Sequence, residues 1–397
     1  MHPTLSSVTR AEALSSSIGR SATGRIGSID AFRGIVILLM LVDHTREFFY
    51  LDYQVGDPMD IATTSPALFG SRLAAHFCAP VFVLLTGLAA WLYGAGKGGA
   101  HAASGFLLKR GLFLIALEWT VVNFAWTFDP TPDTIFLQVI WAIGLSMIAL
   151  AALVHLPRRV LVAIALLLIL GHNLLDGITI PAGQPGHAVW AILHERGYIE
   201  LPWGARARTS YPVLPWIGVI ALGYAIGPWF ARDADPARRR RLLVVGGAAS
   251  LVLFATLRSN NLYGDPHPWQ AGGDTLHTVM SFLNLTKYPP SADFLLLTVG
   301  CGVLLLAALE CGAKRAVAIL SVFGSAPLFF YLLHLYVLHA ANRVVGVLSG
   351  DGSALVSVQA VWGLWLIAAC VALPCWFACR AFAAAKRRSG AWWMRYL

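Results

Sequence analysis

Ten long apolar runs alternate with short polar segments along the chain. A helix that crosses a bilayer needs roughly 20 mostly apolar residues. On this basis we predict spanning helices at residues 29–48, 71–94, 106–127, 135–155, 158–175, 211–231, 241–257, 291–310, 326–347 and 357–380. Residues 186–200 carry too much charge to span and are expected at the membrane interface. The pattern therefore predicts an all-α fold, a polytopic transmembrane helix bundle of about ten spans, within a membrane domain over residues 29–381.

Positively charged residues gather in every second connection between these runs. Cytoplasmic loops collect Lys and Arg, whereas the opposite loops need not. Bases precede the first run and follow the second, fourth, sixth, eighth and tenth, while the other loops carry acidic residues such as Asp129 and Asp265. Both termini are therefore predicted to be cytoplasmic. Residues 1–28 read as a mobile tail, and residues 382–397 as a basic and aromatic interfacial tail.

Composition narrows the class of protein further. The 397 residues are 57% hydrophobic and only 12% charged, whereas soluble domains carry roughly 25% charged residues. The net charge of +9 comes from short clusters between apolar runs, which do not form a nucleic-acid-binding face. The six cysteines include no CxxC pair and no histidine at metal-ligand spacing, so no metal site is expected. We expect a multi-pass protein of the cell (inner) membrane.

The first apolar run, SIDAFRGIVILLMLVDHTREFF, holds ionisable residues within or beside the bilayer. Such residues cost free energy unless they are paired or face a cavity. At helical spacing one face carries Asp30, Arg33, Ile37, Met40, His44 and Glu47. Asp30 and Arg33 fit either an intrahelical ion pair or a site for an anionic substrate group. His44 fits either an interfacial residue or a proton carrier, because imidazole titrates near neutral pH.

Other polar residues lie in the outer halves of later runs. His76 lies one turn inside the second run, above Pro80, and fits either a structural histidine or one that faces a cavity. The remaining outer-half candidates are Tyr211, Trp216, Lys287, Tyr288 and His339. Tyr331 and His334 accompany His339 in the ninth run, and Glu118 lies near mid-membrane in the third. These residues are candidates to converge with His44 on one cavity.

Signatures of common soluble enzymes are missing from the sequence. It has no Walker A loop, no nucleotide-binding GxGxxG after a strand, no GxSxG nucleophile elbow and no HExxH. Phosphoryl transfer, serine hydrolysis and zinc proteolysis therefore have no motif to support them.

Five segments together resemble a known family. They are Ser28–Gly34 with Asp43 and His44, His76–Phe82 running to Thr86 and Gly87, Tyr211–Trp216, Thr286–Ser291, and Pro327–His334. The set is similar to the bacterial DUF1624 family, which is related to heparan-alpha-glucosaminide N-acetyltransferase and to the wider transmembrane acyltransferases. The resemblance implies transfer of an acyl group, acetyl from acetyl-CoA, to an acceptor at or beyond the outer face.

The resemblance also implies a catalytic histidine at the outer side. The lysosomal acetyltransferase of this group has its histidine in the loop after the first helix, but residues 45–75 contain none. His44 is therefore the candidate, as in the broader acyltransferase group whose first helix ends in histidine.

We hypothesise that His44 acts as a general base on an acceptor hydroxyl or amine. Asp43 or Glu47 is a candidate to orient His44, and His76 is the second candidate for the base or an oxyanion donor. An acyl-histidine intermediate stays open.

The remaining candidates divide into two groups. Those for CoA phosphates or another anionic group are Arg33, Arg72, Lys287 and Tyr288, and those for the substrate are Glu47, Tyr211, Trp216, His334 and His339. Expected partners are acyl-CoA, a glycan or lipid-linked acceptor and membrane lipids, with a homodimer left open. The alternative function is a transporter or flippase, because ionisable residues in spanning helices also mark solute pathways.

Overall fold

The computed structural model of the chain describes residues 26–49, 58–348, 358, 360–389, 391 and 394. Nearly all of the predicted N-terminal tail, and Trp392, Trp393 and Tyr396 of the predicted C-terminal tail, lie outside these residues. The longer helices are α2 (Gly27–Phe49), α4 (Cys78–Ala95), α5 (Ala100–Leu117), α7 (Val139–Leu153), α8 (Arg158–Gly171), α10 (Leu214–Ala225), α11 (Pro236–Asn260), α13 (Ala292–Leu309), α14 (Lys314–Gly324), α15 (Pro327–Leu348) and α16 (Val361–Arg388). The shorter ones are α3 (Pro66–Ala75), η1 (Glu118–Val122), α6 (Asn123–Thr127), η2 (His172–Leu175), α9 (His187–Leu193), η3 (Gly227–Phe230) and α12 (Thr275–Leu283).

Each of the ten predicted spans overlaps one of the longer helices. Among the described residues, six helical stretches are long and apolar enough to cross a membrane. They are Pro66–Ala95, Arg158–Leu175, Pro236–Asn260, Ala292–Leu309, Pro327–Leu348 and Val361–Arg388. Helices α7 and α10 are apolar but have only 15 and 12 residues. A multi-pass membrane protein is therefore confirmed, while the count of ten spans and the cytoplasmic termini stay predictions.

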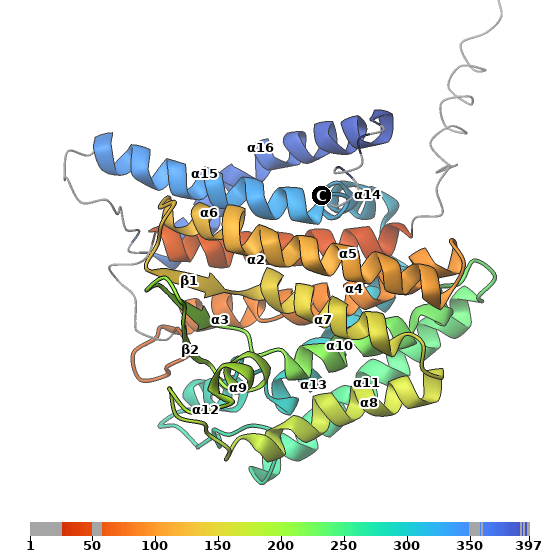
Figure 1. Cartoon of the computed structure of the whole chain (residues 1–397), viewed down its shortest axis with the longest axis horizontal. Coiled ribbons are helices and arrows are strands. Elements are labelled where there is room, and N and C mark those ends of the chain that lie inside the picture. Colours follow the sequence, from red (N-terminus) through yellow and green to blue (C-terminus); the bar gives the residue numbers. More distant parts are fainter. Residues whose placement is uncertain are drawn as a thin grey trace, which may run out of the picture.

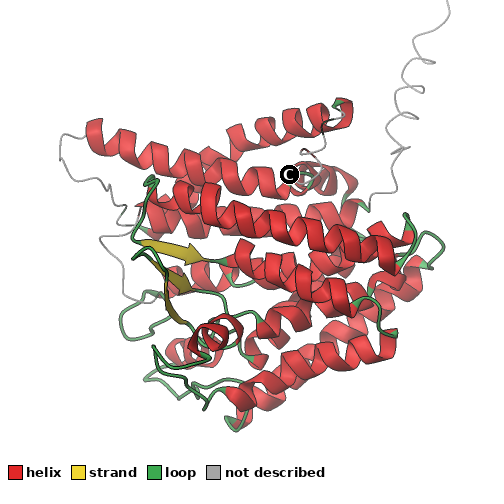
Figure 2. Ribbon diagram, viewed as in Figure 1, coloured by secondary structure: helices red, strands yellow, loops and turns green. Residues whose placement is uncertain are grey.

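The long helices lie side by side, and the short elements gather at one end of them (Figure 1). Three strands lie at this end: β1 (Thr134–Leu137), β2 (Gly197–Glu200) and β3 (Arg206–Thr209) (Figure 2). Their order is β1-β3-β2, with β1 parallel and β2 antiparallel to β3. Helix α2 ends here, and so we refer to it as the predicted outer end.

The small sheet corrects the expectation of a purely helical chain. Residues 135–137 of the predicted fourth span form β1, and residues 186–200 contain both α9 and β2. Strands of four residues are too short to show an alternating pattern in the sequence. Asn123 fixes the position of β1, because its side chain accepts a hydrogen bond from Phe136 N (2.8 Å) and donates one to Phe136 O (3.0 Å).

Glycines allow the central helices to approach at backbone distance. A Cβ added to Gly87 of α4 would lie 1.9 Å from Ile220 O, and one added to Gly223 of α10 would lie 2.0 Å from Leu84 O. Small residues at such crossings are typical of membrane helices, where close packing supplies much of the attraction. The pair α4 and α10 therefore forms a rigid centre of the bundle.

Helix α14 was not predicted from the sequence. It has 11 residues, too few to span, and it packs along the first half of α2. A Cβ on Gly324 of α14 would lie 1.8 Å from Asp30 O. Helix α14 thus fixes the end of α2 that is predicted to be cytoplasmic.

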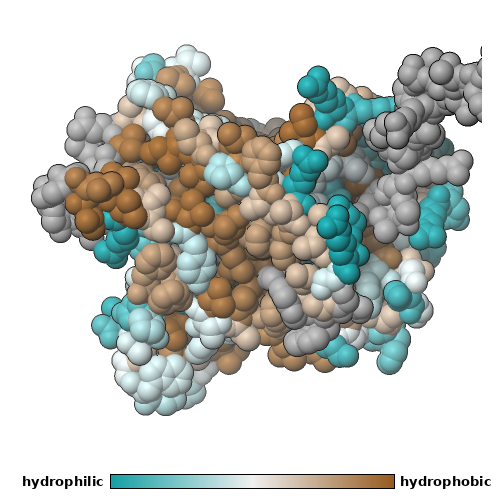
Figure 3. Space-filling model, turned by 90° about the horizontal axis from the view of Figure 1, so that it is seen from above, coloured by the Kyte–Doolittle hydropathy of each residue, from teal (hydrophilic) through white to brown (hydrophobic). Residues whose placement is uncertain are grey.

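One broad face of the molecule is apolar. Figure 3 shows this face as mostly hydrophobic, with hydrophilic residues gathered toward its ends. On α16 the side chains of Trp362, Leu366 and Leu373 are exposed by 71%, 55% and 64%. Apolar side chains exposed in this number mark a surface that lipid covers.

Candidate functional site

Two histidines meet near the outer end of α2. His44 Nδ1 lies 2.7 Å from His334 Nε2, and the two rings are stacked with 11° between their planes. The pair joins α2 to α15 across 290 residues of sequence. His334 is fully buried, whereas His44 is partly accessible.

The partners of the two rings decide which nitrogen carries each proton. His334 Nδ1 lies 2.7 Å from Phe330 O, and because a carbonyl can only accept, this nitrogen is the donor. In the neutral ring, His334 Nε2 then carries a lone pair and accepts the proton of His44 Nδ1. His44 Nε2 is thereby left with a free lone pair, and no hydrogen bond within the described chain occupies it.

Aromatic side chains surround His44 and limit its rotation. Trp126 and Tyr331 present their edges to the imidazole, with ring centroids 5.1 and 5.9 Å away. Trp126 comes from α6, which follows the π-helical turn η1. His44, on α2, is therefore confined by side chains of α6 and α15.

A charged cluster lies beside His44, on the neighbouring face of α2. Asp43 pairs with Arg72 of α3 and, at 3.5 Å, with Arg46 Nε. Arg46 also pairs with Glu47. Asp43 and Glu47 are thus held by arginines, and neither forms a hydrogen bond with His44 in the structure; the orienting partner of His44 is His334.

The loop before α13 brings Lys287 and Tyr288 to the same cluster. Lys287 is 8% exposed, and its ammonium lies 5.3 Å from the centre of the Tyr288 ring. The Tyr288 hydroxyl donates to the Tyr211 hydroxyl at 3.3 Å. Burial raises the pKa of the Tyr288 hydroxyl, but the charges of Lys287 and Arg72 outweigh burial and lower this pKa below its ordinary value.

Two further candidates lie behind this cluster. His76 is 2% exposed at the end of α3, its ring 5.2 Å from that of Phe294, and its Nδ1 has no hydrogen-bond partner among the residues described. Trp216 is fully buried with its ring 6.0 Å from that of Tyr211. Both side chains are buried and pack behind the charged cluster.

Two candidates lie elsewhere. Arg33 is 11 residues before His44 on α2, roughly 16 Å along the helix axis, where it pairs with Asp30 at 3.1 Å. His339 stacks on Phe128 with ring centres 3.7 Å apart, and its Nδ1 lies 2.9 Å from Ala125 O. The structure does not bring Arg33 or His339 to the His44 pair.

A cavity lies within the bundle between α2, α4, α5, α7 and α15, and two of its lining residues, Met40 and Tyr331, are neighbours of His44. Its volume is about 90 Å³, and its walls are Met40, Phe82, Thr86, Arg110, Leu114, Val139, Ile140, Ile143, Met147, Pro327, Leu328 and Tyr331. Met40 lies one turn before His44, and Tyr331 touches it. Arg110 and Pro327 lie on the side of the predicted cytoplasmic end. A larger cavity of about 320 Å³, between α4, α8, α10, α11 and α13, has no ionisable side chain in its lining.

Arg110 was missed as a candidate from the sequence. Together with Lys109 it reads as a cytoplasmic orientation signal, and nothing in its neighbourhood along the chain distinguishes the two residues. Only the packing of α5 against α7 places Arg110 at the cavity.

Glu118, the mid-membrane carboxylate, has a structural position. It is fully buried, and its two oxygens accept hydrogen bonds from Trp141 N (3.0 Å) and Gln138 N (3.3 Å) at the beginning of α7. It therefore caps this helix, whose first backbone N–H groups have no acceptor within the helix. Glu118 was the main candidate for a solute pathway through mid-membrane, and its carboxylate is instead engaged by the beginning of α7.

Comparison with known proteins gives one family. Residues 25–258 match the family described as heparan-alpha-glucosaminide N-acetyltransferase, catalytic. This range includes α2, α3 and α10 and therefore His44, Asp43, Arg72, His76 and Trp216. No curated protein matches the chain.

Proposed function

The chain belongs to the catalytic family of heparan-alpha-glucosaminide N-acetyltransferase, and on that premise we propose that it moves an acetyl group from acetyl-CoA to a hydroxyl or amine of a glycan-type acceptor at the non-cytoplasmic side. The observation that carries this proposal is the His44–His334 pair, which leaves a lone pair free on His44 Nε2. Met40 and Tyr331, two neighbours of His44, line the cavity within the bundle.

In the proposed reaction, His44 Nε2 takes the proton of the acceptor hydroxyl or amine. The acceptor oxygen or nitrogen then forms a bond to the acetyl carbonyl carbon, and the carbon–sulfur bond of the thioester breaks. The departing CoA sulfur takes the proton from His44, which returns to its neutral form. General-base assistance of this kind typically contributes about 10² to 10⁴ in rate.

His334 is a positioning residue in this proposal. By accepting the His44 Nδ1 proton it holds the imidazole in the one tautomer that has Nε2 free. The role is similar to that of the third residue in a catalytic triad, which fixes the orientation and tautomer of a histidine base.

The positive groups beside His44 are assigned to the charge that develops on the thioester oxygen. Asp43 neutralises Arg72, whereas no acidic side chain in the described ranges pairs with Lys287. Lys287, with His76 as a second donor, is therefore the proposed stabiliser of the oxyanion, because a fixed charge in a buried site acts strongly. Tyr211, Tyr288 and Glu47 are the proposed contacts of the acceptor at the outer rim.

The cavity is the proposed place of the acyl-CoA arm. Its walls are apolar except for Thr86, Tyr331 and Arg110, and Arg110, toward the predicted cytoplasmic end, is the proposed contact of an anionic part of the donor. Its volume of about 90 Å³ is below the roughly 300–1,000 Å³ of typical ligand pockets. Donor binding therefore requires the lining side chains to move apart.

The test uses the purified chain in proteoliposomes with acetyl-CoA labelled in the acetyl group. Glucosamine serves as the amine acceptor and a methyl glucoside as the hydroxyl acceptor. The proposal predicts label in an acceptor and one free CoA thiol for each acetyl group transferred. It is contradicted if neither acceptor is labelled and acetyl-CoA shows no saturable binding. Accumulation of unmodified sugar inside the vesicles would support the transporter alternative instead.

A further inference from the structure

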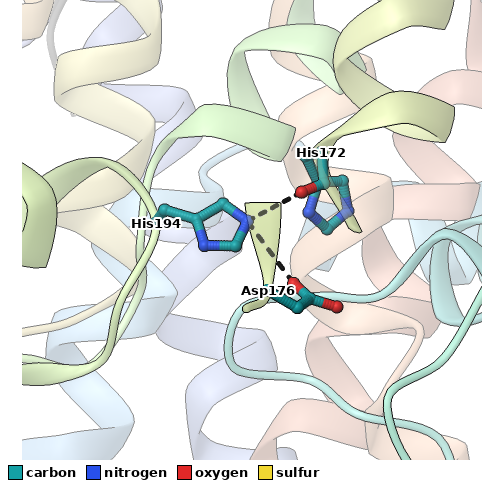
Figure 4. A group of neighbouring side chains, drawn as sticks. All are labelled: His172, Asp176 and His194. Carbon is teal, nitrogen blue, oxygen red and sulfur yellow. Dashed lines mark hydrogen bonds and ion pairs between the residues drawn. The ribbon is translucent and has the colours of Figure 1, made fainter. Parts of the chain in front are cut away.

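Three potential metal ligands meet at the outer end of α8, away from the His44 pair. His172 begins η2, Asp176 follows it four residues later, and His194 ends α9. Their ligand atoms all lie within 4.8 Å of one another, and Figure 4 shows the side chains facing a common space. Spacing along the sequence did not indicate this group, because 22 residues separate the two histidines.

His172 has a buried imidazole without a partner. It is 2% exposed, and neither ring nitrogen forms a hydrogen bond with any described residue. The backbone of Pro290 lies near the ring, but it forms no hydrogen bond of acceptable geometry with either ring nitrogen. A buried polar group left unsatisfied costs roughly 1–3 kcal/mol, and such groups in native proteins often indicate an ion or a water.

The distance between His194 and Asp176 fits a shared metal better than a hydrogen bond. His194 Nε2 lies 3.5 Å from Asp176 Oδ1, beyond the 2.7–3.2 Å of ordinary N–H···O bonds. Two ligand atoms at roughly 2.1 Å from a tetrahedral zinc ion lie roughly 3.4 Å apart. The two atoms are therefore separated by about the length of one edge of such a tetrahedron.

Neighbouring groups hold two of the three ligands in position. Asn173 Nδ2 donates to Asp176 Oδ2 at 2.8 Å, which leaves Oδ1 facing His194. The Trp190 ring stacks on His194 with 21° between the planes. Hydrogen bonds and packing of this kind orient the ligands in metal sites.

We propose that His172, Asp176 and His194 bind a divalent transition-metal ion of the zinc class, with water as the fourth ligand. Two imidazoles and one carboxylate suit zinc, whereas calcium and magnesium prefer oxygen ligands alone. His194 Nε2 now lies 2.9 Å from His172 O, to which it donates. Metal binding transfers that proton to Nδ1 or to solvent and turns the Nε2 lone pair to the ion.

The metal would connect η2 and the end of α9 to the loop before α13. Asn173 Oδ1 accepts from Ala292 N at 2.9 Å, and Arg196, two residues after His194, lies over the Tyr288 ring at 5.1 Å. Occupancy of the site would therefore fix the segment that carries Tyr288.

The experiment uses the full chain purified in detergent with a tag that contains no histidine, stripped with EDTA and dialysed. Titration with Zn²⁺ is followed by calorimetry, and Co²⁺ is used for its visible absorption in a tetrahedral site. We expect one equivalent of Zn²⁺ per chain, no binding of Mg²⁺ or Ca²⁺, and a rise of a few degrees in the Tm with Zn²⁺.

Variants decide which residues bind the ion. H172A and the isosteric D176N should each weaken Zn²⁺ binding at least tenfold and remove the rise in Tm. H277A is the control, because His277 is an exposed imidazole that pairs with Asp274 in another outer loop. Equal Zn²⁺ affinity in wild type and D176N, or no Zn²⁺ binding by the wild type, would overturn the proposal. The D176N result also covers the case in which H172A does not fold.

Discussion

At the level of single residues, the free lone pair of His44 Nε2 depends on which nitrogen of each imidazole carries a proton. The Phe330 carbonyl determines the His334 tautomer, and His334 in turn determines that of His44. Asp43, the neighbour of His44 in sequence, is engaged by Arg72 and Arg46 instead. A carbonyl of the α15 backbone thus directs the proposed base on α2 through one intervening ring.

The first prediction concerns His334. H334A should lower kcat by about 10- to 10²-fold, less than loss of the base itself, because His44 can then adopt the wrong tautomer. The KM for acetyl-CoA should stay unchanged, since His334 does not line the cavity. H334Q, which keeps an acceptor oxygen and N–H donors, should recover part of kcat. A proportional loss of folded protein in both variants would show a purely structural role.

At the residue scale, the sequence indicated the individual candidates but not their pairing. His44 and His334 each stand out as polar residues in an apolar run. Their contact spans 290 residues and depends on how α15 packs against α2. The charged partners of Asp43 were likewise visible only as separate arginines.

At the element scale, the bundle is held by helix crossings at glycine. The apolar runs predicted where the long helices lie, because length and hydropathy are properties of a single segment. The crossings, the short strands and α14 depend on contacts between segments, and the sequence pattern did not predict them. Gly87 and Gly223 mark one such close contact, between α4 and α10.

The second prediction concerns that crossing. G223A should destabilise the protein markedly, because the new Cβ would lie 2.0 Å from Leu84 O, a backbone atom that cannot rotate away. G105A in α5 is the matched control: nothing lies within 4 Å of its added Cβ, and Ala favours a helix more than Gly. The measurement is the Tm in one detergent. A G223A protein as stable as G105A would show that α4 and α10 are further apart than described.

At the scale of the whole molecule, a cavity within the helical layer is lined by Met40 and Tyr331, which are neighbours of His44. The larger cavity of the bundle has no ionisable side chain in its walls, so cavity size alone would not indicate the site proposed at His44. Charge along the sequence gave the expected orientation, and family membership gave the class of reaction. The cavity depends on the packing of the five helices that line it, and the sequence did not predict it.

The third prediction concerns this cavity. I143W should weaken acetyl-CoA binding at least tenfold, because the indole would occupy the space assigned to the donor arm. L253W places the same side chain in the larger cavity and should leave acetyl-CoA affinity unchanged. Affinity is measured by calorimetry on samples matched for Tm, since overpacking also costs stability. Equal loss in both variants would assign the effect to stability and not to the cavity.

The turnover of H44A tests the proposed role of His44 most directly. Purified H44A should keep the Tm and acetyl-CoA affinity of the wild type, while the rate of acetyl transfer falls by about 10² to 10⁴. In the wild type this rate should also fall as the pH is lowered, because protonation of His44 removes its lone pair. H277A, altered at an exposed histidine, should match the wild type. A folded H44A protein that transfers acetyl groups as fast as H277A would contradict the account.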